Sequence, residues 1–229
     1  MTRRFGMLIF PRLTQLDMTG PYEVLARLPD TQVDLVAKTM DPVTTDRGMQ
    51  IVPTVTYETC PPLDIVMVPG GPGQQDLMED EAALSFLRKQ AAGAKYVTSV
   101  CTGSLVLAAA GLLKGKRATC HWAAIEHLAL LGAIPTKERV VVDGDVVTGA
   151  GVASGIDFAL TLASILEGEA VAREIQLQIE YDPDPPFDGG SPKTARPETI
   201  AALSSRLSKL NEERRTVATR VGRKLGTAP

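Results

Sequence analysis

The residue best placed for chemistry is Cys101, which stands where a strand-like stretch ends and a helical pattern begins. Residues 96–100 are mostly β-branched, and the small residues Gly103 and Ser104 allow a tight turn into the Ala/Leu-rich stretch 105–110. This layout is that of a nucleophile elbow with cysteine in place of serine. A sulfur at a helix N-terminus faces a dipole and free N–H groups that favour a thiolate. The alternative is a buried cysteine that serves only packing.

Asp17 and Thr102 are the polar residues that could work with such a sulfur. Asp17 stands between Leu16 and Met18, where a carboxylate is unusual unless it caps a helix. If it lies near Cys101 in a buried setting, its pKa rises and it can hold or deliver a proton. Thr102 can form a hydrogen bond near the sulfur or orient a water molecule, although it fits equally well as an ordinary helix start.

A glycine pair, Gly70 and Gly71, follows the strongly apolar stretch 63–68. Without a side chain, Gly71 can turn its backbone N–H toward a bound group. Together with the N–H of Thr102, it could polarise a substrate or stabilise a developing charge. Taken alone, the pair is explained by a tight turn.

Two histidines and two further cysteines complete the reactive side chains. His121 lies in a turn beside Trp122, where it could form a dyad with Cys101 or simply pack, whereas His127 falls inside a helical pattern. Cys60 and Cys120 have no helix N-terminus behind them, so we interpret both as structural. The histidines are six residues apart and no cysteine pair has ligand spacing, so we expect no metal site.

The elements that must position these residues alternate between strands and helices. This order predicts an α/β sandwich with a mostly parallel sheet, in which ligands bind beyond the C-terminal ends of the strands. The loops that carry Asp17, the glycine pair and Cys101 each follow a strand, as does the small-residue loop 149–155. We therefore expect them to converge. The predicted buried strands are residues 5–10, 33–37, 63–68 and 96–100.

The remaining elements are predicted from turn and capping residues. Residues 12–18 are predicted as a loop, with Thr19 or Gly20 capping the helix that follows and Pro21 in its first turn. Asp143 and Gly144, between two apolar runs, indicate a hairpin. An edge strand is predicted at 51–57, and further helices at 81–92, 123–131, 156–166 and 169–179.

The C-terminal part differs from the rest. Residues 181–190 are rich in proline, glycine and aspartate and predict an extended arm. An amphipathic helix over 197–210, or on to 225, follows. We therefore divide the chain into a core, 1–182, and an appendage, 183–229, which packs on the core or on a dimer partner. Its basic end could suggest DNA, but a solvated face that suits the helix dipole is the better interpretation; this end carries Arg214, Arg215, Arg220, Arg223 and Lys224.

Composition excludes several classes of protein. The 229 residues are 44% hydrophobic and 22% charged, with a net charge of −3, so nothing indicates binding to nucleic acid or an anionic membrane. No apolar run approaches a membrane span, and the N-terminal apolar run is too short for a secretory signal. The three cysteines are odd in number and lack the spacing of a disulfide framework, so we expect no such framework. We expect a cytoplasmic protein.

Two motifs resemble the ThiJ/PfpI superfamily: VMVPGG at 66–71 and SVCTGS at 99–104. The resemblance covers about residues 5–180 and implies a flavodoxin-like three-layer sandwich with an elbow cysteine. It is greater still for the isonitrile (isocyanide) hydratase branch. The stretches similar to that branch are 15–22, 98–107, 115–119, 155–162 and 178–187.

The resemblance implies an enzyme that hydrates isonitriles, R–N≡C, to N-substituted formamides. By this analogy Cys101 attacks the terminal carbon and forms a thioimidate, Asp17 protonates the carbon or the nitrogen and then activates water, and Thr102 lies beside both. Relatives of this kind are homodimers, and no cofactor is implied. Cys120 stands where a threonine is expected, and Val152, near the implied site, would reshape the pocket.

Three other activities occur on the same fold, and one sequence feature bears on each of them. Peptidase-like members carry histidine directly after the elbow cysteine, where this chain has Thr102. A glyoxalase- or deglycase-like enzyme acting on α-oxoaldehydes would use the same cysteine and is the main alternative. A ligand sensor of the AraC type would need about a hundred residues of helix-turn-helix domain after the core, and only about forty follow.

Overall fold

A seven-stranded sheet forms the middle layer of the computed structural model, in which residues 2–228 are described. The strand order is β10-β11-β7-β6-β1-β2-β5, and every pair except β10–β11 is parallel. The central strand Ile65–Val68 is entirely apolar and buried because both faces of the sheet are covered. The strands are β1 (Arg3–Leu8), β2 (Thr31–Ala37), β5 (Val55–Thr56), β6 (Ile65–Val68), β7 (Tyr96–Val100), β10 (Val140–Asp143) and β11 (Val146–Gly149).

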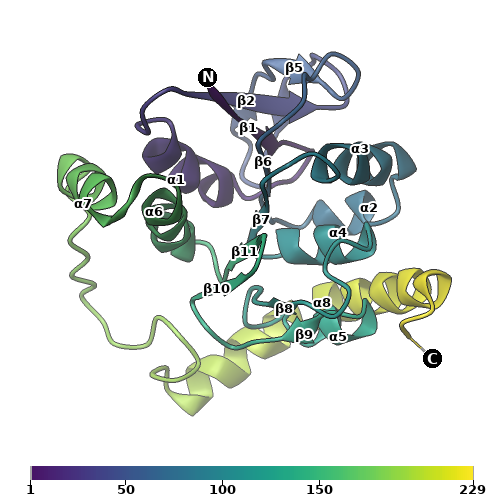
Figure 1. Cartoon of the computed structure of the whole chain (residues 1–229). Helices are drawn as coiled ribbons and strands as arrows, with labels where there is room; N and C mark the ends of the chain where they lie inside the picture. The colour runs from purple at the N-terminus through teal and green to yellow at the C-terminus, as the bar shows by residue number, and fades with distance from the viewer. Residues whose placement is uncertain (1, 229) are drawn as a thin grey trace.

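Helices cover both faces of this sheet, so the predicted flavodoxin-like three-layer sandwich is confirmed (Figure 1). One face carries α1 (Gln15–Leu25), α6 (Ser154–Glu167) and α7 (Glu169–Gln178). The other face carries α2 (Gln74–Leu77), α3 (Glu81–Ala91), α4 (Gly103–Ala109), α5 (His127–Leu130) and most of α8 (Pro197–Leu225). The Asp80 side chain caps α3, since it accepts hydrogen bonds from the amides of Ala82 and Ala83.

The start of the first helix was predicted wrongly. Proline favours the first turn of a helix, which suggested a start near Gly20. In the structure α1 begins at Gln15, and Pro21 lies inside it. The helix tolerates the proline because it is held by packing on α6, where Gly20 lies against Ile156. Asp17 is therefore in the first turn of a helix and not in a loop.

Two other predicted elements are shorter than expected. The edge strand predicted at 51–57 is split at Pro53, which has no N–H to donate, and only β5 joins the main sheet. The helix predicted at 123–131 is a series of turns that ends in α5. The predicted hairpin is confirmed, with β10 and β11 antiparallel around Gly144. Two small sheets join β3 (Val43–Thr44) to β4 (Gln50–Ile51) and β8 (Arg117–Ala118) to β9 (Ile134–Pro135).

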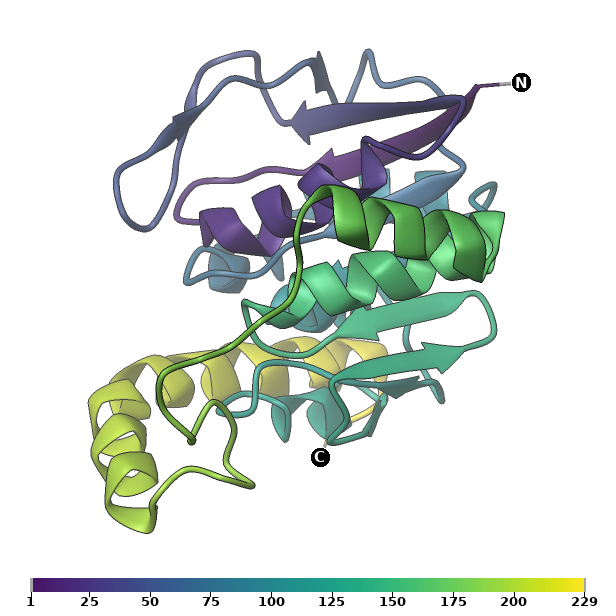
Figure 2. The same ribbon diagram turned by 90° about the vertical axis from the view of Figure 1, so that its left-hand side faces the viewer.

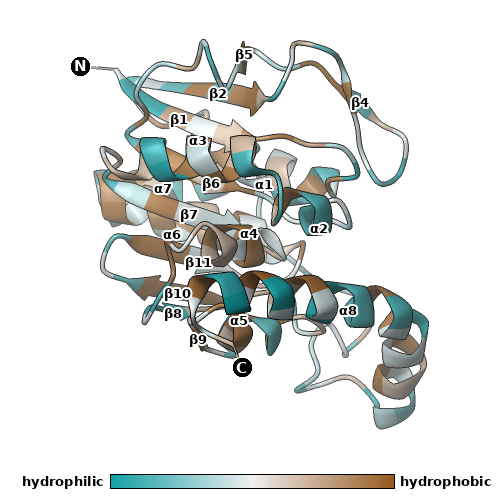
Figure 3. Ribbon diagram, turned by 90° about the vertical axis from the view of Figure 1, so that its right-hand side faces the viewer, coloured by the Kyte–Doolittle hydropathy of each residue, from teal (hydrophilic) through white to brown (hydrophobic). Residues whose placement is uncertain are grey.

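The C-terminal helix returns to the body of the protein after a long irregular arm. The arm runs from the end of α7 past the sheet edge to the start of α8 (Figure 2). Hydrophobic and hydrophilic residues alternate around α8 (Figure 3), and its apolar side contacts α4 and α5. At Gly222 the two helices meet closely, because a Cβ atom there would lie 2.1 Å from the carbonyl oxygen of Leu130. Glycine at this position is what lets α8 pack on α5.

We expect Gly222→Ala to destabilise the protein, although alanine normally favours a helix over glycine. The added methyl group would force α8 away from the Leu130 carbonyl, at a cost of about 1–3 kcal/mol in the free energy of unfolding. Urea titrations of the full chain measure this change. Gly93→Ala is the matched control, because nothing lies within 4 Å of the added atom. Equal stability of the two variants would mean that α8 does not pack closely on α5.

Candidate active site

Cys101 occupies the sharp turn that the sequence predicts. It follows β7, its φ angle is 58°, and Thr102 is the N-cap residue of α4. This left-handed conformation is rare for a residue with a side chain and is typical of a nucleophile elbow. Two residues after Cys101 the chain requires glycine, because a Cβ atom at Gly103 would lie 2.0 Å from the carbonyl oxygen of Val68. The turn is thus locked against the end of β6.

The loop after β6 brings three predicted site residues together around Gly70. The Gly70 amide donates a hydrogen bond to Oδ2 of Asp17, 3.0 Å away. A Cβ atom at Gly70 would lie 2.5 Å from the Thr102 nitrogen and 2.7 Å from the same carboxylate oxygen. Glycine is therefore required here for close approach, and the loop joins α1 to the elbow.

The Gly71 amide does not have the role expected from the sequence. Its N–H donates to Oγ1 of Thr102, 3.0 Å away, so it is not free to bind a substrate. The buried Thr102 hydroxyl also lies 3.4 Å from the Gly71 carbonyl oxygen, and it connects the elbow to the glycine loop. The Thr102 backbone N–H interacts with the Cys101 sulfur and lowers the pKa of that thiol. Of the two amides expected to act together, that of Gly71 binds the Thr102 side chain and that of Thr102 faces the Cys101 sulfur.

Asp17 is fully buried beside the elbow. Burial raises the pKa of Asp17 to about 7, against the opposing effects of the Cys101 thiol and the Gly70 amide, while the Asp46 carboxylate adds to the increase. Its second oxygen, Oδ1, has no hydrogen-bond partner among residues 2–228. A carboxyl group with a pKa near neutrality and one free oxygen can both accept and donate a proton.

The Cys101 sulfur is a thiol at rest, not the thiolate expected from its helix N-terminus. Burial raises the pKa of Cys101 well above its usual value, and the charges of Asp17 and Cys120 raise it further. The short helix α4 and the Thr102 amide do not outweigh these effects. A thiolate therefore forms only when the proton moves to a neighbouring base, and Asp17 is adjacent.

His121 is not part of a Cys–His dyad in this structure. Its Nδ1 accepts a hydrogen bond from the Ala123 amide at 3.3 Å, and no hydrogen bond joins it to Cys101 within the described residues. Burial, followed by the charge of Arg214, lowers the pKa of His121 to about 4, so the ring is neutral at physiological pH. The ring lies against Gly151, 3.3 Å from the position of a Cβ atom there.

Val152 lies in the loop between β11 and α6, partly buried against the core. The same loop approaches the elbow at Gly155, where a Cβ atom would lie 3.5 Å from the Val100 side chain. Gly149 likewise lies close to Val100, the residue directly before Cys101. The loop 149–155 is thus beside the elbow, as its position in the sequence predicts.

Three buried polar side chains were missed by the sequence reasoning. Gln74 at the start of α2, Ser154 at the start of α6 and Arg214 on α8 all have buried polar atoms without hydrogen-bond partners among the described residues. Arg214 was assigned to a solvated basic face, but only 5% of it is exposed.

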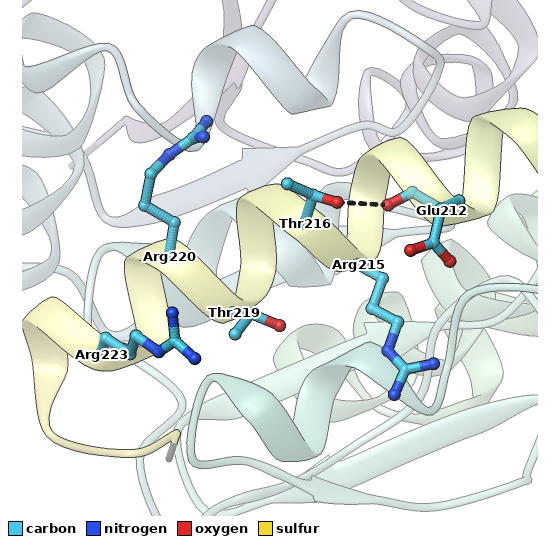
Figure 4. A pocket seen from close by; sticks show the side chains of 6 residues that line it. All are labelled: Glu212, Arg215, Thr216, Thr219, Arg220 and Arg223. Carbon is cyan, nitrogen blue, oxygen red and sulfur yellow. Dashed lines mark hydrogen bonds between the residues drawn. The ribbon is translucent and has the colours of Figure 1, made fainter.

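Helical spacing could have identified Arg214. It lies four residues after Leu210 and four before Ala218, so it falls on the apolar side of α8 that also carries Val221. The neighbouring basic residues do lie outside. Arg215, Arg220 and Arg223 line an outer cleft of about 390 Å³ on α8 together with Glu212, Thr216 and Thr219 (Figure 4). None of the residues around Cys101 lines that cleft.

A smaller cavity of about 160 Å³ lies between Trp122, the arm and the first turns of α8. No cluster of three or more histidine, cysteine or acidic side chains that could hold a metal ion occurs within residues 2–228. In that same part of the chain, no helix combines the length and apolar character that crossing a membrane requires.

Comparison with known proteins places these features in context. A model of the DJ-1/PfpI family matches residues 3–165. The isonitrile hydratase of Pseudomonas putida is 56% identical over 225 residues, which cover 98% of this chain and 99% of that protein. The glutathione-independent glyoxalase DJR-1.2 of Caenorhabditis elegans is 30% identical and matches 60% of this chain and 74% of that protein. A crystal structure of a ThiJ/PfpI family protein from Pseudomonas syringae has a TM-score of 0.93 at 43% identity, covering 95% of this chain and 91% of that one.

The raised pKa of Asp17 predicts how the stability of the protein depends on pH. The unfolded chain, in which this group ionises near pH 3.8, binds fewer protons than the folded chain between about pH 4 and pH 7. Stability therefore falls as pH rises through this window. Asp17→Asn removes the titration, so its advantage in unfolding free energy over the wild type should grow by about 2–3 kcal/mol from pH 5 to pH 7.

Urea titrations at several pH values measure this difference. Asp188→Asn is the control, because Asp188 is exposed on the arm and its replacement should leave the pH dependence unchanged. A constant difference between Asp17→Asn and the wild type across the window would show that folding does not raise the pKa of Asp17.

Proposed function

This chain belongs to the DJ-1/PfpI family, and we propose that it is an isonitrile hydratase, an enzyme that adds water to R–N≡C and releases an N-substituted formamide. The observation that carries the proposal is the buried carboxyl group of Asp17 beside the elbow thiol, with a pKa of about 7 and a free Oδ1 atom. The similarity to the isonitrile hydratase of Pseudomonas putida extends over both chains almost completely and supports the same conclusion.

In the first half of the reaction, sulfur adds to the isonitrile carbon. The Cys101 sulfur forms a bond to the terminal carbon while the Asp17 carboxylate takes the thiol proton. Asp17 then gives this proton to the same carbon, which leaves a thioimidate, S–CH=N–R. No separate acid is needed, because the proton returns to the atom that sulfur has attacked.

In the second half, water replaces sulfur. Asp17 takes one proton from the water that attacks the thioimidate carbon and passes it to nitrogen, which gives a tetrahedral S–CH(OH)–NH–R adduct. The C–S bond then breaks, its electrons return to sulfur, and the hydroxyl proton reaches the thiolate through Asp17. A carboxyl group with a pKa near 7 suits these repeated transfers because neither of its forms is strongly favoured.

The surrounding residues hold this pair in place. The Gly70 amide fixes Oδ2 of Asp17, which leaves Oδ1 for the moving proton. Thr102 holds the glycine loop through its hydroxyl group and directs its own N–H toward the sulfur. With a pKa of about 4 His121 is a weak base, and its Nδ1 accepts a hydrogen bond from the Ala123 amide, in agreement with chemistry that requires only one carboxyl group.

We expect Cys101→Ser and Asp17→Asn to abolish most of the hydration of a simple alkyl or aryl isonitrile. Loss of the general acid and base costs about 10²–10⁴-fold in rate, and loss of the thiol costs at least as much. Formamide release, followed by NMR or chromatography, measures both. Cys60→Ser is the control and should keep wild-type turnover, because Cys60 lies at the turn before β6, away from the glycine loop and the elbow.

Unfolding cannot explain a loss of hydration activity in Asp17→Asn, because this variant is expected to be more stable than the wild type at neutral pH. A wild-type protein that converts none of several isonitriles would overturn the proposal. Loss of methylglyoxal in a parallel assay, without formamide production, would favour the α-oxoaldehyde alternative that the glyoxalase of Caenorhabditis elegans represents.

We also propose that two copies of the chain associate through the face formed by α1, α6 and α7. Large apolar side chains are exposed there, namely Leu16, Tyr22, Ile165 and Leu177. Burying them against a second copy would remove this surface from water.

The extended arm, with Phe187 83% exposed, and α8 form the C-terminal appendage that reaches beyond the family core.

Sedimentation equilibrium tests this association and should give about twice the chain mass of 24.4 kDa. Leu177→Glu should weaken the dimer by placing a charge on the shared face. Val52→Glu is the matched control and should leave the mass unchanged. Val52 is exposed just before the edge strand β5, outside the helices of the proposed interface. A monomer in the wild type at micromolar concentration would contradict the proposal.

A reducing compartment fits the proposed chemistry. The three cysteines, Cys60, Cys101 and Cys120, are all free, and the reaction needs Cys101 as a thiol. We therefore propose a cytoplasmic location, where thiols stay reduced.

A further inference from the structure

Arg214 is a buried cation on α8. Only 5% of the residue is exposed, and Nη1 donates to the neutral amide oxygen of Asn211, 3.1 Å away. Its Nε atom has no hydrogen-bond partner, and no carboxylate within residues 2–228 forms an ion pair with it. A buried charge is costly unless something compensates it, so another negative group must face this guanidinium.

Helix α8 is held against the neighbouring helices at points on either side of Arg214. One turn before it, the Gln75 side chain of α2 donates to the Leu210 carbonyl oxygen at 3.2 Å. Eight residues after it, Gly222 packs on the Leu130 carbonyl, and the Thr227 hydroxyl donates to the same oxygen at 2.9 Å. Between these points α8 contacts α4, the helix that begins at the elbow.

The segment that carries Cys120 is hydrogen-bonded to α4. The Ser104 hydroxyl, in the first turn of α4, lies 2.6 Å from the Thr119 carbonyl oxygen and 2.8 Å from the Ser99 hydroxyl. Cys101 and Cys120 are therefore both buried next to the start of α4. Burial lowers the pKa of Arg214, and the negative forms of Cys120 and Cys101 oppose this effect; no carboxylate contributes.

Charge balance at the elbow requires a cation. During the proposed reaction Asp17 and Cys101 share one proton, so one negative charge remains in a buried site. His121 does not balance it, because its pKa of about 4 leaves the ring neutral. Burial and Arg214 also lower the pKa of His127, which is the other histidine near α8.

We propose that Arg214 is a positioning residue that supplies the buried positive charge balancing the negative charge shared by Cys101 and Asp17. The helix beyond the family core thereby completes the electrostatics of the site. The proposal deepens the proposed function and relies on it for the identity of the substrate, but the reactivity of the thiol tests it without an isonitrile.

The other charged groups around the site are few. Asp17 faces Cys101 from α1, with Asp46 behind it, and Cys120 faces it from the segment before α5. His121 and His127 face Arg214 from the α5 side, and Glu212 and Arg215 flank it on α8. Any change in the pH profile must be separated from titration of these groups.

The experiment compares Arg214→Met, which replaces the aliphatic stem and loses the charge, with Arg214→Lys, which keeps a charge. The rate of Cys101 alkylation by iodoacetamide is measured on the full chain from pH 6 to pH 10. Mass spectrometry of tryptic peptides separates Cys101 from Cys120, because Lys114, Lys116 and Arg117 lie between them. Arg214→Met should slow alkylation about tenfold at pH 7.5 and move the profile upward by about one pH unit, and Arg214→Lys should restore most of the rate.

For isonitrile hydration, Arg214→Met should lower kcat with KM nearly unchanged. Arg214→Gln, which keeps a polar group, is measured in parallel and should behave like Arg214→Met. Arg215→Met is the matched control: Arg215 lines the outer cleft of α8 (Figure 4), and its loss should leave both profiles as in the wild type.

Two results would overturn the proposal. One is a wild-type alkylation profile in folded Arg214→Met or Arg214→Gln. The other is an equal loss in Arg214→Lys and Arg214→Met, which would mean that the residue matters for packing and not for charge. If alkylation depends on the charge at position 214 while no isonitrile is hydrated, the proposed function fails and the role of Arg214 stands.

Discussion

The site depends on one hydrogen bond, from the Gly70 amide to Oδ2 of Asp17. It joins the first helix to the loop after β6, and the same loop is joined to the elbow through Gly71 and the Thr102 hydroxyl. Glycine at position 70 is required because the elbow nitrogen and the carboxylate oxygen leave no room for a Cβ atom. Three segments distant in sequence therefore meet on a residue without a side chain, and this close approach places acid and thiol together.

In the proposed mechanism, burial performs the task that a histidine performs in many cysteine enzymes. An imidazole activates a thiol by accepting its proton near neutral pH. At this elbow the neighbouring position is Thr102, and His121 is neutral with a pKa of about 4. Desolvation instead brings the pKa of Asp17 to about 7, so a carboxyl group acquires the proton affinity of an imidazole. The same desolvation keeps Cys101 protonated at rest, which ties formation of the thiolate to proton transfer.

The C-terminal helix α8 places a buried charge next to the helices of the core. The family match ends at residue 165, and α8 begins at Pro197. Its outward arginines form a solvated basic surface, but its inner face carries Arg214 into the layer of helices that contains the elbow. A segment that contributes no strand to the sheet can thus be part of the electrostatics of the site, because a buried charge acts over several ångströms where water is excluded.

Local patterns in the sequence determined much of the protein. Apolar runs identify the central strands, Asp143–Gly144 the hairpin, and the strand–cysteine–glycine pattern the elbow, because each depends on neighbours in the chain. Asp17 stood out as a carboxylate between two apolar residues, and the family resemblance implied its role. Only the tertiary structure decided that Pro21 lies inside α1, since packing on α6 outweighs the local preference of proline. It alone decided that the Gly71 amide binds Thr102, that Cys101 is a thiol at rest and that Arg214 is buried. Hydrogen-bond partners and desolvation depend on segments far apart in sequence, so no local pattern contains them.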